Sequence, residues 1–244
     1  MGFLKEKFSI KFFLFIGVAF LLVNIPIIGN YISIINTVIH ESGHAFVALF
    51  GGQVESISLF MNSDGVTYGR ESIWIIDFFT SIAGYVVSSL MAFLSFWLIQ
   101  KKQYTFLIDI LLGYILLNLI FWVRNPYGVF WLVSFGFIFL TLLIKGSKTL
   151  INNLLLLIAS VLLVESIGSA YDILIISMMH PQSAGDATNL SELTVILPAQ
   201  AWGIFFFAQS LWFCFLGYKQ GLFAVERQDR HFVEDVGGDK GEYH

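Results

Sequence analysis

The sequence predicts an all-α polytopic membrane protein with about six to seven transmembrane helices. A small β-hairpin is expected after a helix that carries a His-Glu-x-x-His pattern. Of the 244 residues, 57% are hydrophobic and only 12% are charged, whereas an ordinary soluble domain has roughly 25% charged residues. A chain of this composition cannot cover a surface that faces water on all sides. Several apolar runs also reach the roughly 20 residues that a helix needs to cross a bilayer.

Seven apolar runs are candidate membrane-spanning helices, so a lipid bilayer is an expected partner. They are Phe12–Ile28, Tyr31–Phe50, Ile73–Ile99, Phe106–Val123, Val129–Ile144, Leu154–Met179 and Ala201–Tyr218. The first run follows three lysines, as in a signal peptide, but it has no small-residue cleavage site, so we expect a retained anchor. Seven full crossings conflict with a simple positive-inside count, and the conflict largely disappears if the second run does not fully cross.

The remaining features bound the domain organisation and the partners. We expect one multi-span membrane domain over residues 1–225, followed by a polar, mobile tail over residues 226–244. The sequence has no basic patch of the kind that predicts binding of nucleic acid, so we expect no nucleic-acid partner. The single cysteine, Cys214, excludes an internal disulfide. No feature of the sequence defines an oligomeric state.

Three ionisable residues, His40, Glu41 and His44, stand inside the apolar run Tyr31–Phe50. On a helix, residues four apart project from nearly the same face, so the two imidazoles could bind one zinc ion. Zinc lowers the pKa of bound water towards about 7, and Glu41 is placed to take a proton from that water. Ionisable groups at membrane depth are costly. The pattern therefore predicts a catalytic metal site rather than two buried histidines bonded to their neighbours.

The stretch HESGHAFVALFGGQVESISL, from His40 to Leu59, resembles the site-2 protease family of intramembrane zinc metalloproteases, most closely its compact bacterial branch without a PDZ domain. Segments 124–128 and 185–203 resemble that branch less specifically. The resemblance implies zinc ligands at His40 and His44, a general base at Glu41, a membrane protein as substrate and a place in the bacterial cell membrane. The Leu-Asp-Gly motif that supplies the third zinc ligand in better-known members is missing here.

Two aspartates are candidates for the third ligand, because catalytic zinc usually has three protein ligands and one open position. Asp172 ranks slightly ahead of Asp186. It lies about 10 Å from the end of its helical run, and His44 lies about 9 Å from the end of its own, so the two residues are expected at similar depth. Asp186 could N-cap a short helix, or a polar loop could bring it to the zinc. The aspartate that is not a ligand could orient a ligating histidine, as could Glu165.

The hairpin is predicted from two strand-like segments, Val54–Met61 and Val66–Tyr68, that flank the turn sequence NSDG. An exposed strand edge can bind an extended peptide by backbone hydrogen bonds. The predicted function is an intramembrane zinc endopeptidase that hydrolyses peptide bonds in membrane-spanning or membrane-inserted protein segments by metal-activated water. Two alternatives stay open: a transporter or proton/metal pathway protein that uses the same His/Glu/Asp cluster, or a catalytically silent relative that acts as a binding partner.

Overall fold

The computed structural model describes residues 9–71 and 73–224, apart from the side chain of Glu71. The fold is mostly helical. In chain order the elements are α1 (Ile10–Val23), α2 (Ile28–Ala48), β1 (Gly52–Leu59), β2 (Gly65–Glu71), α3 (Trp74–Gln100), α4 (Tyr104–Leu117), the π-helix η1 (Asn118–Trp122), α5 (Pro126–Lys145), α6 (Lys148–Met179), the 3-10 helix η2 (Pro181–Ser183), α7 (Asp186–Thr194) and α8 (Ala199–Lys219).

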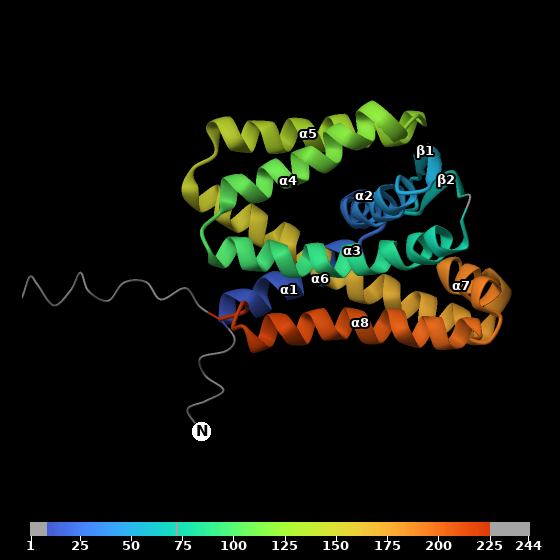
Figure 1. Ribbon diagram of the computed structural model, residues 1–244. Coiled ribbons are helices and arrows are strands. Elements are labelled where there is room, and N and C mark those ends of the chain that lie inside the picture. Colours follow the sequence, from blue (N-terminus) through green and yellow to red (C-terminus); the bar gives the residue numbers. More distant parts are fainter. Residues whose placement is uncertain (1–8, 72, 225–244) are drawn as a thin grey trace, which may run out of the picture.

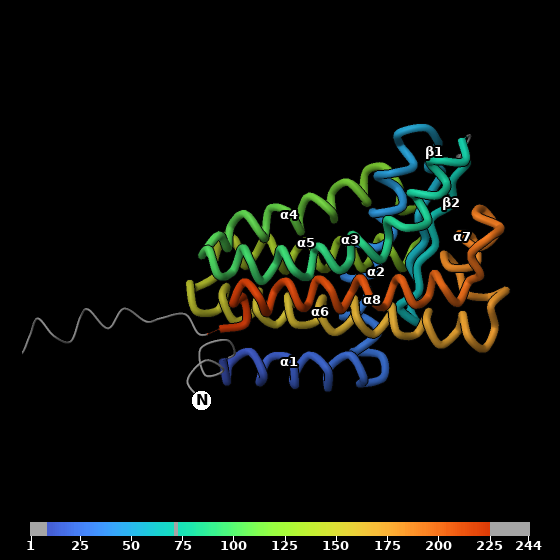
Figure 2. Tube along the Cα trace, turned by 60° about the horizontal axis from the view of Figure 1, so that its bottom comes forward, coloured from blue at the N-terminus to red at the C-terminus, as the bar shows by residue number. Residues whose placement is uncertain are grey.

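The long helices α3, α6 and α8 pack side by side, with α4 and α5 along one flank and α1 along another (Figures 1 and 2). The hairpin and α7 lie together at one end of this bundle in both views. The opposite end is closed where the Ser9 N–H donates to the carbonyl oxygen of Phe223, at 2.8 Å. The hairpin and α7 therefore lie at the same end of the helical bundle.

Five helical segments in the described part of the chain are long and apolar enough to cross a membrane. They are Trp74–Gln100, Tyr104–Trp122, Pro126–Lys145, Lys148–Met179 and Ala199–Lys219. Helices α1 and α2 pass the same test only as a pair, which is bent by 108°, so the number of candidate spans is five or up to six. This confirms the predicted fold class and is consistent with a multi-pass membrane protein. The polar tail predicted over residues 226–244 lies outside the described residues.

The bend between α1 and α2 has local causes. Pro26 lacks an N–H donor, and Ile27 has a positive φ of 70°, which a β-branched residue rarely adopts. A Cβ atom at position 29 would collide with the carbonyl oxygen of Val23, so the turn requires glycine there. The first two apolar runs of the sequence therefore form two helices, α1 and α2, that meet at a sharp bend and do not continue as one straight helix.

The hairpin pairs β1 with β2 in antiparallel register, with Leu59 opposite Gly65. The outer edge of β1 is partly covered, because Val123 forms a parallel bridge with Ile57. Next to this bridge, the Asn125 side chain accepts a hydrogen bond from the Leu59 N–H at 3.1 Å and donates one to the Leu59 carbonyl at 2.6 Å. Among the described residues, the outer edge of β2 has no backbone partner. The sheet thus has one covered edge and one open edge.

Arg124 holds the covering segment in place. Its guanidinium donates hydrogen bonds to four carbonyl oxygens at the end of η1, those of Leu119, Ile120, Phe121 and Val123. These are carbonyls that a helix end otherwise leaves without partners. Arg124 therefore caps the end of η1.

The pair of hydrogen bonds from Asn125 yields a test of the hairpin. A hydrogen bond contributes roughly 0.5–1.5 kcal/mol, so Asn125→Leu, which loses both, is expected to speed hydrogen exchange at the Leu59 amide roughly 10- to 100-fold. Mass-spectrometric hydrogen exchange of the purified protein measures this. Asn24→Leu, which changes an asparagine outside the hairpin, is the control and leaves the Leu59 rate unchanged. An unchanged rate in Asn125→Leu contradicts the interpretation.

Candidate metal centre

Helix α2 carries His40, Glu41 and His44, and the structure confirms the helix predicted for them. Glu41 and His44 are buried, with 5% and 7% of their surface exposed, and His40 is half-buried. The spacing of four residues brings the two imidazole rings together with their centroids 4.6 Å apart. The helix therefore presents two ring nitrogens to the interior of the bundle.

An aspartate from α7 completes a triangle with these nitrogens. The Nε2 atoms of His40 and His44 lie 2.9 Å apart, and Oδ2 of Asp186 lies 3.4 Å from the first and 3.3 Å from the second. In tetrahedral zinc with bonds of about 2.0–2.1 Å, ligand atoms are about 3.3 Å apart. The three residues could therefore hold a metal ion, and they form the one such group within residues 9–71 and 73–224.

The loop after α6 sets the position of Asp186. The Thr188 hydroxyl donates to the Pro181 carbonyl at 2.8 Å and accepts from the Ala184 N–H at 2.9 Å. Gly185 has a φ of +47°, a conformation that favours glycine, and it turns the chain so that α7 begins at Asp186. The N-cap of α7 is Gly185 and not Asp186, so the capping role considered for this aspartate is not observed.

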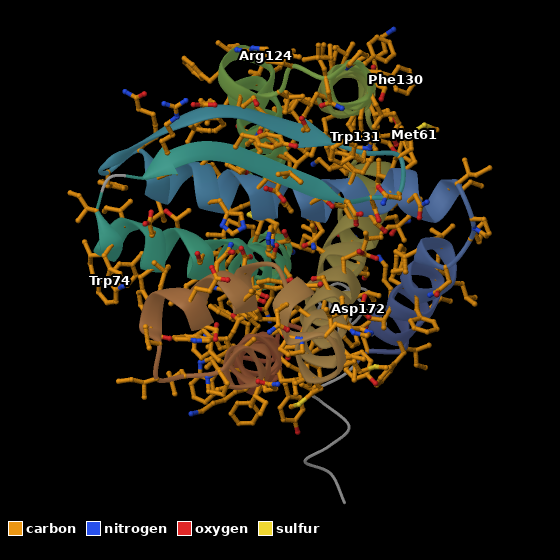
Figure 3. All side chains as sticks on the ribbon, turned by 90° about the vertical axis from the view of Figure 1, so that its right-hand side faces the viewer. Met61, Trp74, Arg124, Phe130, Trp131 and Asp172 are labelled. Atoms are coloured by element: carbon orange, nitrogen blue, oxygen red, sulfur yellow. The ribbon has the colours of Figure 1, made fainter. Side chains whose placement is uncertain are left out.

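Asp172, the residue that the sequence ranked first, is not part of this group. It is exposed on α6, and Figure 3 shows it on the opposite side of this end of the molecule from Trp74. The next residue, Ile173, is the one that α6 contributes to the wall around the histidines. Glu165 of α6 is likewise outside the group.

Hydrogen bonds fix the protonation of the centre. The Nδ1 atom of His44 lies 2.7 Å from the carbonyl oxygen of Thr80, which can only accept, so Nδ1 carries a proton and Nε2 is the nitrogen that faces Asp186. A metal ion would displace the proton that Nε2 shares with Asp186 and take its lone pair. Burial acts to raise the pKa of Asp186, but the charge of His44 and the hydrogen bonds from both histidines outweigh it and hold this pKa below its usual range. Asp186 is therefore ionised at neutral pH, as a metal ligand must be.

Helix α3 leaves space for the centre through Gly84. A Cβ atom at this position would lie 2.5 Å from Nε2 of His40 and 2.6 Å from Nε2 of His44. Any side chain would therefore collide with the two nitrogens that could bind a metal. This glycine, together with the tautomer of His44 and the ionised Asp186, shows that the residues present fit a metal ion.

The hairpin positions Glu41. The Thr67 hydroxyl of β2 donates to Oε2 of Glu41 at 2.6 Å, and it also lies 3.2 Å from the backbone carbonyl oxygen of Glu41. A Cβ atom at Gly65 would lie 2.7 Å from Cγ of Glu41, so the start of β2 packs directly on this side chain. The sequence pattern indicates neither Thr67 nor Gly84 as a site residue. Their contribution depends on contacts between elements, although the small residues around Gly84 do indicate close helix packing.

A cavity of about 640 Å³ joins the triangle, Glu41 and the open edge of β2. Its lining residues come from α2, β2, α3, α6, α7 and the residue before α7: His40, Glu41, His44, Gly65, Val66, Thr67, Gly69, Asp77, Thr80, Ser81, Tyr85, Ile173, Gly185, Asp186, Asn189, Glu192 and Leu193. The candidate metal ligands, the Glu41 carboxylate and the edge of β2 that has no backbone partner among the described residues therefore share one space.

Fold and site together define a protein with several candidate membrane-spanning helices and a His-His-Asp cluster, beside a buried glutamate, that could hold a metal ion. The sequence model of the family described as Peptidase M50B-like matches residues 13–217. The chain therefore belongs to the Peptidase M50B-like family, which confirms the resemblance to site-2 proteases. No curated protein and no solved structure matches the chain.

The contact at Gly84 leads to a prediction. Gly84→Ala is expected to weaken metal binding by at least about 10-fold, because the added methyl group displaces both imidazoles from their positions. Gly113→Ala is the matched control, since a Cβ atom there meets nothing within 4 Å. Competition with a chelator, followed by elemental analysis of the folded protein, measures the affinity. If Gly84→Ala and Gly113→Ala bind metal with equal affinity, the conclusion that Gly84 leaves the space needed by the two imidazoles is wrong.

Proposed function

We propose that this protein is an intramembrane zinc endopeptidase. It hydrolyses peptide bonds in membrane-spanning or membrane-inserted segments of other proteins, in the membrane of a bacterial cell. Membership of a peptidase family supports this proposal. The observation that carries it is the convergence of His40, His44 and Asp186 with Glu41 on a single cavity.

His40, His44 and Asp186 are the zinc ligands in this proposal. The bound zinc would polarise the scissile carbonyl and lower the pKa of a water molecule. Asp186 takes the position for which Asp172 was preferred on the sequence alone. The hydrogen bond from Nδ1 of His44 to the Thr80 carbonyl holds its ring in the orientation that binding requires.

Glu41 acts as general base and then as general acid. Its carboxylate accepts a proton from the attacking water and later donates that proton to the leaving amine. Thr67 binds one carboxylate oxygen and so restricts the rotation of the side chain, which leaves the other oxygen for proton transfer. Because Glu41 is 5% exposed, most of its surface is shielded from bulk water, and it faces the cavity from which the attacking water comes.

The open edge of β2 receives the substrate. A transmembrane helix hides its backbone groups in internal hydrogen bonds, so the segment to be cut must be unwound first. An extended segment could then pair with the backbone of β2. Thr67 lies on this strand and contacts Glu41, so a peptide bound to β2 passes the catalytic base.

Metal analysis tests the ligand assignment. Wild-type protein purified in detergent with zinc supplied is expected to contain about one zinc ion per chain. His44→Ala and Asp186→Asn are expected to lose it, because two ligands hold zinc poorly, whereas Asp172→Asn keeps it. Elemental analysis gives the stoichiometry, and circular dichroism verifies that each variant is folded. Loss of zinc in Asp172→Asn together with retention in Asp186→Asn would reverse the assignment, and a zinc-free wild type would remove the proposal.

Replacement of the base separates binding from chemistry. Glu41→Gln is expected to retain zinc and to lose cleavage by about 10²–10⁴-fold, the usual contribution of a general base. Proteoliposomes that contain a panel of single-spanning reporter proteins provide the assay. Glu55→Gln is the control, since Glu55 is exposed and pairs with Arg70 in the hairpin. Undiminished cleavage by the Glu41 variant, or cleavage by neither protein, would contradict the proposal.

A further inference from the structure

We infer that the outer part of the cavity binds a basic side chain of the substrate, Lys or Arg, through Asp77, with Glu192 beside it. This inference rests on the proposed peptidase function and adds a substrate class to it. The substrate segment carries a positive charge a few residues from the bond that is cut.

The first observation is the charge of the cavity wall. Four carboxylates line it, those of Glu41, Asp77, Asp186 and Glu192, and its described lining residues include no lysine or arginine. The proposed reaction uses only Glu41 and Asp186. Two negative charges therefore face the same space without a function in hydrolysis.

The second observation is a pair of buried oxygen atoms on α3. Oδ1 of Asp77 and Oγ1 of Thr80 are both buried and have no hydrogen-bond partner among the described residues. Thr80 is more than nine-tenths buried, with 8% of its surface exposed. The two residues are three positions apart on the helix, so they lie on the same face, and both line the cavity.

Buried oxygens without donors are unfavourable, so these two atoms indicate that a donor group belongs between them. A lysine ammonium offers three N–H donors and an arginine guanidinium offers five, and neither has an acceptor. One such group can satisfy the acceptors of Asp77 and Thr80 together. A neutral amide could donate to both but would leave the negative charge of Asp77 without a counter-charge, and an acidic side chain would be repelled.

The third observation brings α7 to the same place. The Trp74 indole N–H donates to the carbonyl oxygen of Leu193 at 2.9 Å and ties the first turn of α3 to α7. Asp77 follows Trp74 by one turn, and the exposed Glu192 precedes Leu193. Trp74, labelled in Figure 3, therefore marks the place where the first turn of α3 meets α7, and Asp77 and Glu192 from these two helices both line the cavity.

The distance along α3 sets the register of the basic side chain. Asp77 precedes Gly84, which contacts the two histidines, by seven residues, or about 10 Å along the helix. An extended peptide advances about 3.3 Å per residue, so this level is about three residues from the scissile bond. Strand β2 leads from Glu41 towards the start of α3, since Thr67 contacts Glu41 and the strand ends at Glu71, three residues before α3 begins at Trp74.

The position of Asp77 also matches the chemistry of membrane segments. It lies in the first turn of a candidate span, close to the end of the helix and hence to the membrane face. Lysine and arginine are common next to spanning segments at this level. The substrate class is therefore a membrane segment whose flanking basic residue enters the cavity as the adjoining backbone unwinds.

Peptide binding tests this inference independently of cleavage. The probes are fluorescent, mainly apolar peptides with Lys, Gln or Glu at one position, moved through four positions on each side of a central dipeptide. Anisotropy measures their binding to full-length, zinc-loaded Glu41→Gln protein in detergent. At one register the Lys peptide is expected to bind about 3- to 10-fold more tightly than the Gln peptide, and the Glu peptide more weakly.

Variants in the same background assign the effect. Asp77→Asn is expected to remove the preference, and Asp77→Lys is expected to reverse it in favour of Glu. Asp109→Asn keeps the preference, since Asp109 is an exposed carboxylate on α4 outside the cavity wall. Equal or absent binding of all peptides overturns the inference, as does a preference that survives Asp77→Asn. A second metal ion per chain that only Asp77→Asn loses also overturns it, because Asp77 would then be a metal ligand.

Cleavage of the same peptides by wild-type protein distinguishes the two proposals. Glu41-dependent cleavage without any charge preference keeps the peptidase and overturns the basic subsite. An Asp77-dependent preference in binding without any cleavage keeps the subsite and contradicts the peptidase.

Discussion

The close contact between α2 and α3 is the constraint on which the rest of the site depends. A Cβ atom at Gly43 would lie 3.0 Å from the carbonyl oxygen of Ala83, and one at Gly84 would meet both imidazoles. Small residues on both helices let the backbones approach. The approach brings the Thr80 carbonyl to Nδ1 of His44 and leaves the Nε2 atoms beside a residue without a side chain. The close packing of α2 on α3 therefore also sets the geometry of the metal site.

In the proposed function, the hairpin links peptide binding to Glu41, the proposed general base. Asn125 and Val123 cover part of the outer edge of β1, so the open edge is that of β2. The same strand supplies Thr67, which holds the Glu41 carboxylate. In the proposed function, a peptide that pairs with β2 therefore acts on the strand that orients the base. A site of this kind favours cleavage of a segment that is correctly bound over cleavage of one that only touches the cavity.

The sequence predicts the parts of this structure that depend on local pattern. Apolar length identifies the spans, and a spacing of four residues places His40 and His44 on one face. Which of Asp186 and Asp172 lies beside the histidines depends on the path of the loop after α6 and on the rotation of α6 about its axis. Asp172 and Ile173 are about 100° apart on α6, so an argument from depth cannot tell which of them faces the cavity. The turn at Gly185 is held by hydrogen bonds of the Thr188 hydroxyl within the same loop, but no local pattern shows that this loop brings Asp186 to the histidines of α2.

The bend after α1 is a second case of this kind. A proline in an apolar stretch indicates a break, but the angle of 108° depends on the positive φ of Ile27 and on close contact at Gly29. Apolar content alone counts two crossings where the structure has one bent pair. The sequence therefore predicts which segments are apolar enough for the membrane. Packing determines whether two such segments form two crossings or one bent pair.

Charge explains how such a cavity can be acidic and still be selective. Carboxylates that share a low-dielectric space repel each other. A cation in the His-His-Asp cluster would offset the negative charges of Asp186 and Glu41. The excess of negative charge then lies at the rim, on Asp77 and Glu192. A negative rim at a membrane face repels anionic lipid headgroups and attracts basic side chains. In the proposed function, the same two carboxylates therefore keep anionic headgroups out of the cavity and select the segment that enters it.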